Sequence, residues 1–111
     1  MNQLERIGEI ISAYSKHDWQ LKRVLLRPET LAEFSAAGGA SFGEAIVREA
    51  TVDALWFARP SHAGREAWEL RLVAETPYAL FETFEADEAE EEREEVRREM
   101  EARLNSNQAR S

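Results

Sequence analysis

One short segment brings together side chains that could bind an anionic group. The segment reads Arg59-Pro60-Ser61-His62-Ala63-Gly64-Arg65, so two guanidinium groups flank the imidazole of His62. Guanidinium and imidazolium groups donate charge-assisted hydrogen bonds to carboxylates and phosphates. We therefore treat Arg59, His62 and Arg65 as a candidate ligand-binding site of an anion-binding domain or a small enzyme. The alternative interpretation is a solvated connection between two strands.

No arrangement of side chains in the sequence specifies catalysis. Ser61 is next to His62, but nucleophilic catalysis needs the two side chains aimed at each other and oriented by a third group, which adjacency does not establish. The chain contains no cysteine, which excludes a cysteine nucleophile and a thiolate metal site. We predict no catalytic residues, and a non-enzymatic role is favoured.

Neither a metal ion nor a cofactor is expected. His17 and His62 are 45 positions apart, without an H-x-x-x-H motif or a carboxylate at metal-ligand spacing. The glycine-rich stretch 38–43 has neither the Lys-Ser/Thr of a P-loop nor the G-x-G-x-x-G spacing of a dinucleotide fold. This stretch is interpreted as a connection between elements.

The negative charge of the chain is concentrated near its C-terminal end. The chain has 22 acidic and 14 basic residues and a formal net charge of −8, of which residues 85–104 contribute −6 from ten acidic and four basic side chains. Negative charge repels a phosphate backbone, so nucleic acid is not an expected partner. On a helix, Glu91, Glu92 and Glu95 share one side, which is a candidate surface for a basic protein partner. The alternative is a solvated helix face.

The aromatic content gives a second reason to expect a protein partner. Three tryptophans, five phenylalanines and two tyrosines are a large aromatic area for 111 residues, and most of them must fill the core. Phe42 in the glycine-rich stretch and Phe57 on the second face of an expected strand are candidate contacts with a partner. An apolar patch left on that face predicts self-association as a homodimer.

Apolar periodicity predicts the elements that position these residues. Apolar residues recur at helical spacing over 3–15, with Asn2 as the N-cap. Residues suited to a half-buried strand follow over 19–27, and their imperfect period allows a bulge. Pro28 then opens a short helix that reaches Phe34.

The strongest hairpin signal follows the glycine-rich stretch. The chain becomes extended over 44–59, passes through turn residues at 60–65 and becomes extended again over 68–73. The expected register places Asp53 opposite Arg71 and leaves one face of the hairpin almost wholly apolar. The same register pairs Val52 with Leu72, Ala54 with Leu70 and Trp56 with Trp68.

Residues 78–84 have two interpretations. Their aromatic and β-branched content favours a strand, whereas their apolar spacing also allows one long helix to about residue 104. We favour the strand because Asp87 followed by Glu90 provides a new helix start. A charged helix with a thin apolar stripe is then expected over 88–104, followed by a disordered tail over 105–111.

Together these elements predict one α+β domain over residues 1–104. It has an N-terminal helix, a short middle helix, a mainly antiparallel sheet of about four strands and a charged C-terminal helix. No segment approaches the ~18 apolar residues of a membrane span, so we expect no membrane contact and a cytoplasmic location. The expected role is a non-enzymatic protein-interaction module that self-associates. The alternative is an anionic-ligand-binding domain or small enzyme that uses the Arg59–Arg65 loop.

Overall fold

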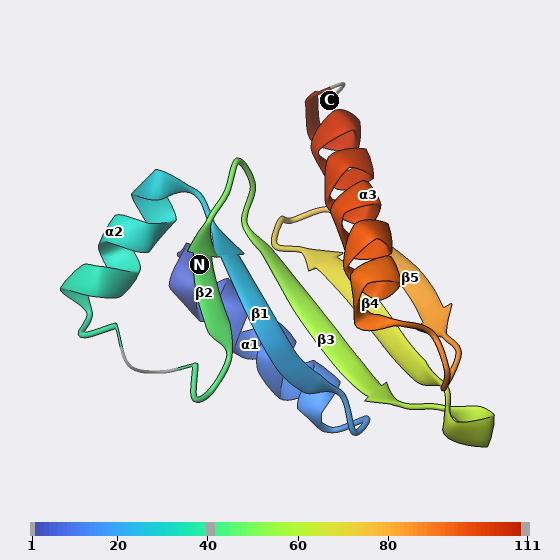
Figure 1. Ribbon diagram of the computed structural model, residues 1–111. Helices are drawn as coiled ribbons and strands as arrows, with labels where there is room; N and C mark the ends of the chain where they lie inside the picture. The colour runs from blue at the N-terminus through green and yellow to red at the C-terminus, as the bar shows by residue number, and fades with distance from the viewer. Residues whose placement is uncertain (1, 40–41, 110–111) are drawn as a thin grey trace.

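A five-stranded mixed sheet with helices on both faces forms the fold (Figure 1). The computed structural model describes residues 2–39 and 42–109. Its elements are α1 (Gln3–Ser15), β1 (Gln20–Leu26), α2 (Pro28–Ala36), β2 (Ile46–Glu49), β3 (Ala54–Pro60), the single-turn 3-10 helix η1 (His62–Gly64), β4 (Glu66–Leu72), β5 (Ala79–Phe84) and α3 (Glu90–Ala109). The predicted α+β class is confirmed.

The strand order is β2-β1-β3-β4-β5, and only the pairing of β1 with β2 is parallel. A parallel neighbour requires a crossover connection, which α2 and the segment after it supply. The expectation of about four mainly antiparallel strands is therefore corrected to five strands in a mixed sheet. The extended run expected over 44–59 divides into β2 and β3 because residues 50–53 leave the strand conformation between them.

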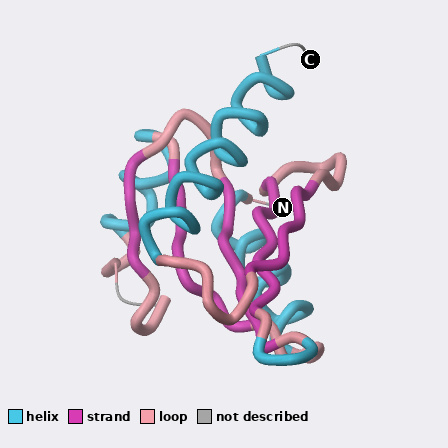
Figure 2. The backbone as a smooth tube through the Cα atoms, turned by 45° about the vertical axis from the view of Figure 1, so that its right-hand side comes forward, coloured by secondary structure: helices cyan, strands magenta, loops and turns pink. Residues whose placement is uncertain are grey.

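The sheet separates two hydrophobic clusters. One lies under α1 and α2, and α3 covers the other from the opposite side, as Figure 2 shows from a second direction. The fully buried residues of the first cluster include Ile7, Val24, Leu26, Leu55 and Phe57, and those of the second include Leu25, Trp56, Leu70, Phe84 and Leu104. Strand β3 contributes to both clusters because successive side chains of a strand point to opposite faces.

Local signals in the sequence explain the starts of the first elements. The side chain of Asn2 caps α1 by accepting a hydrogen bond from the Glu5 backbone N–H at 2.9 Å. A bulge interrupts the register of β1 with β3 between Leu21 and Arg23, which confirms the irregularity expected there. Helix α2 begins at Pro28, since the missing N–H of proline costs nothing in the first turn.

The β3–β4 hairpin forms as expected, but its register differs from the prediction by two residues. Trp56 pairs with Leu70 rather than Trp68, and Leu55 rather than Asp53 lies opposite Arg71. A shift of two residues keeps every side chain on its predicted face, so the apolar face survives although the cross-strand pairs change. The predicted Asp53–Arg71 pair is wrong because Asp53 precedes the strand and turns inward.

The C-terminal part of the chain resolves the two interpretations of residues 78–84. They contain strand β5, which pairs with β4, and a separate helix follows. Helix α3 begins at Glu90 and extends beyond Leu104, so residues 105–109 of the expected disordered tail are helical in the structure. Residues 110 and 111 lie outside the described part of the chain.

Candidate functional site

The three residues of the candidate anion site do not converge. Arg59 donates a hydrogen bond to the His17 carbonyl oxygen at 2.9 Å, and its guanidinium lies 4.5 Å from the centre of the Trp19 ring. Arg65 turns instead to the carboxylate of Glu85 at 2.9 Å. Each guanidinium therefore binds a different element, and neither is directed at a shared anion near the exposed His62.

The loop that carries these residues has a structural explanation. The backbone N–H of Ser61 donates to the Arg65 carbonyl at 2.8 Å, which closes the turn between β3 and β4. Ala63 and Gly64 both have positive φ, at 58° and 76°. A Cβ on Gly64 would lie 3.2 Å from the Cβ of Ala86, so this position also favours glycine for space. The geometry supports the interpretation as a connection between strands.

Six of the seven carboxylates of α3 fall into two groups by their ion pairs. We call Glu90, Glu94 and Glu101 the inner carboxylates, because each binds an arginine that packs beneath or beside the helix. We call Glu91, Glu92 and Glu95 the outer carboxylates. All three are exposed, and none forms an ion pair with the residues that the structure describes. The predicted acidic face therefore exists on the surface.

The inner carboxylate Glu94 connects α3 to the sheet. Arg23 of β1 donates to both of its oxygens, at 3.0 and 2.7 Å, and Arg97 donates to one of them at 2.9 Å. The hydrogen bonds from Arg23, reinforced by the one from Arg97, lower the pKa of Glu94 to about 2 against the opposing effect of burial. This carboxylate therefore remains ionised at any physiological pH.

Arg97 lies in the core on the α3 side of the sheet, an unusual position for a charged side chain. Its side chain is 2% exposed, and its guanidinium lies 3.9 Å from the centre of the Trp68 ring and 5.2 Å from that of Phe84. Its Nε is buried without a hydrogen-bond partner among the described residues. The spacing of the residues in the sequence could have indicated this position. Residues 93, 97, 100 and 104 recur at helical spacing, so Arg97 lies on the same face of the helix as the buried Met100 and Leu104.

Asp53 is a second buried charge with a structural role. It is 3% exposed and accepts hydrogen bonds from the Gln3 side chain at 2.9 Å, the Arg27 backbone N–H at 2.7 Å and the Thr30 hydroxyl at 2.7 Å. These donors come from α1, the turn after β1 and α2. One carboxylate thus holds three segments together.

Tyr14 and Phe57 fill the space between α1 and the sheet. Their rings stack at 4.1 Å, and the Tyr14 hydroxyl donates to Glu69 of β4. Burial and the hydrogen bond to Glu69 raise the pKa of the Tyr14 phenol to about 12. Phe57 itself is 1% exposed, so the expectation that it contacts a partner is wrong: α1 covers the face on which it lies.

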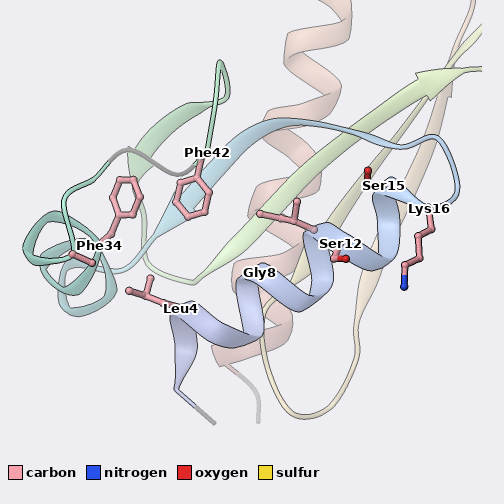
Figure 3. Close-up of a pocket in the computed structure, with 9 residues that line it drawn as sticks. Leu4, Gly8, Ser12, Ser15, Lys16, Phe34 and Phe42 are labelled. Atoms are coloured by element: carbon pink, nitrogen blue, oxygen red, sulfur yellow. The ribbon is translucent and has the colours of Figure 1, made fainter.

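Phe42 lines a groove rather than projecting as a free anchor. Its ring stacks on Phe34 at 4.6 Å, and the two rings face the exposed side of α1 across an open groove of about 650 Å³ (Figure 3). Leu4, Gly8 and Ser12 contribute the α1 wall of this groove. Phe42 is partly buried and remains accessible from the groove.

Within residues 2–39 and 42–109, no three histidine or carboxylate side chains gather as a group that could hold a metal ion. None of the helices described here is long and apolar enough to cross a membrane. Comparisons with models of protein families, with curated proteins and with solved structures find no match for this chain.

Proposed function

We propose that the chain is a non-enzymatic protein-interaction module that binds a basic protein surface with the outer face of α3. The division of the α3 carboxylates carries this proposal. The inner carboxylates are paired with arginines, whereas the outer carboxylates pair with no arginine or lysine of the described residues and are all exposed. Like charges crowded on one helix face raise the energy of the free protein, and a basic partner removes that cost.

Self-association is a separate part of the proposal, and it requires a different surface from the one first expected. Phe57, on the strand face that suggested a homodimer, is 1% exposed, and Leu55 on the same strand is 0% exposed. An interface between copies would therefore use other residues than these two. The absence of cysteine supports a cytoplasmic location, where thiols stay reduced and disulfides are rare.

Charge reversal tests the proposed role of α3. The variant Glu91→Lys/Glu92→Lys/Glu95→Lys should lose the proteins that the unaltered chain captures from its native cell lysate at low salt. The control Glu9→Lys/Glu33→Lys/Glu44→Lys makes the same change in net charge at exposed positions on other elements, and it should retain them. Capture that is equal for both variants, with folding verified by circular dichroism, would exclude α3 as the binding face.

A further inference from the structure

The open edge of β5 offers a regular row of backbone groups that bond to no neighbouring strand among the described residues. β5 is the last strand in the sheet order, and the carbonyl of Tyr78 accepts a hydrogen bond from Leu72 of β4 at 2.9 Å. Because backbone direction alternates along a strand, the N–H and C=O groups of Ala79, Phe81 and Thr83 point away from β4. The Thr83 N–H bonds to the side chain of Glu82 at 3.2 Å, as expected for a group without a neighbouring strand.

The two faces beside this edge differ in chemistry. On the side of α1, Phe81 is 58% exposed and its ring lies 6.4 Å from that of Trp19 in an edge-to-face arrangement. On the side of α3, Glu82 is exposed, and the exposed Asp87 follows the strand. An added strand would therefore meet an aromatic surface on one face and carboxylates on the other.

We propose that the β5 edge binds an extended segment of a partner protein in which basic and apolar side chains alternate. The outward N–H and C=O groups of β5 favour an extended strand as the ligand, because main-chain hydrogen bonds provide the affinity when a strand is added to a sheet. Apolar side chains of the segment contact Phe81 and Trp19, and basic side chains contact Glu82 and its acidic surroundings. This inference rests on the proposed basic partner and specifies its form.

The negative charge of the chain favours a basic partner over a second copy, and the length of β5 favours its edge over the edge of β2. A second copy of the chain, with a net charge of −8, would bring another set of carboxylates against Glu82. The opposite edge of the sheet, β2, has four residues against six in β5 and offers a shorter ladder. The basic, extended segment of another protein therefore fits the β5 edge better than a second copy does.

A synthetic peptide in which lysine and valine alternate is the probe for this site, with binding followed by backbone amide resonances. We expect the largest shifts at Ala79, Phe81 and Thr83. The variant Phe81→Pro removes an outward N–H and leaves the bonds to β4 intact, since proline is tolerated at a sheet edge. It should weaken binding at least about tenfold, which is ~1.4 kcal/mol. A peptide N-methylated at alternate residues should lose affinity for the unaltered protein to a similar degree.

The outcomes separate this inference from the proposed function. One outcome would support an acidic binding face and overturn strand addition. In that outcome, the lysine variant of the outer carboxylates loses the peptide, whereas Phe81→Pro and N-methylation of the peptide leave binding unchanged. Equal binding of a peptide with the same composition in separate lysine and valine blocks would also overturn it. Sedimentation that shows a dimer abolished by Phe81→Pro, with no peptide bound, would assign the edge to a second copy instead.

Discussion

At the scale of single residues, the buried carboxylate of Asp53 determines how α1, the turn after β1 and α2 meet. Asp53→Ala leaves its three short-range donors, on Gln3, Arg27 and Thr30, without their acceptor. Unpaired buried donors are costly, so we expect the free energy of unfolding to fall by about 3 kcal/mol. Urea denaturation measures this change. Asp87→Ala, at an exposed position, is the control and should change stability by less than about 0.5 kcal/mol.

The phenol of Tyr14 should titrate unusually late. Its folded pKa of about 12 lies above the ordinary value of 10, so the folded state favours the protonated phenol. The stability that this preference contributes is complete below pH 10 and is lost as the pH rises towards 12. Ultraviolet difference spectra of the unaltered chain should show this late step, and Tyr14→Phe should remove it. A late step that persists in the Tyr14→Phe variant would contradict the assignment of this step to Tyr14.

At the scale of elements, the attachment of α3 to the sheet should depend on pH through Glu94. Its folded pKa of about 2 is below the ordinary value of 4.5, so its stabilising effect is present above pH 4.5 and is lost as the pH falls towards 2. We expect Glu94→Gln to flatten the decline of the free energy of unfolding over this range, measured by urea denaturation at a series of pH values. Glu95→Gln, on the outer face, should retain the decline of the unaltered chain.

We expect the packing of α3 to depend on the shape of Arg97 more than on its charge. Arg97→Ala removes the side chain that covers Trp68, and we expect a loss of about 2 kcal/mol. Arg97→Met keeps a long side chain over the ring, leaves Glu94 paired with Arg23, and should remain within about 1 kcal/mol of the unaltered chain. Equal losses for both variants in urea denaturation would instead show that the guanidinium itself holds the helix.

At the scale of the whole molecule, the sheet order predicts a gradient of local stability. β3 lies at the centre of five strands and its residues from Ala54 to Ala58 are buried, whereas β2 is an edge strand of four mostly exposed residues. Amide hydrogen exchange should be slowest in β3 and fastest among the strands in β2. Protection in β2 equal to that in β3 would indicate that a partner or a second copy covers the β2 edge.

The sequence predicts the local features of this fold better than the long-range ones. Asn2 and Pro28 mark their helices because capping and φ restriction act within a few residues. The parallel pairing of β2 with β1 depends on a crossover that no local pattern specifies. The inward turn of Asp53 and the burial of Arg97 depend on donors and rings that are distant in the chain, so no local pattern specifies them.

The distribution of tryptophans provides an optical reporter for each side of the sheet. Trp19 packs with the cluster under α1 and α2, whereas Trp56 and Trp68 meet edge to face at 5.8 Å beneath α3. Replacing Trp19 by phenylalanine leaves emission only from the α3 side, and replacing the other two leaves emission only from the α1 side. Fluorescence of such variants can reveal which layer responds first when a binding partner arrives or when the chain is unfolded.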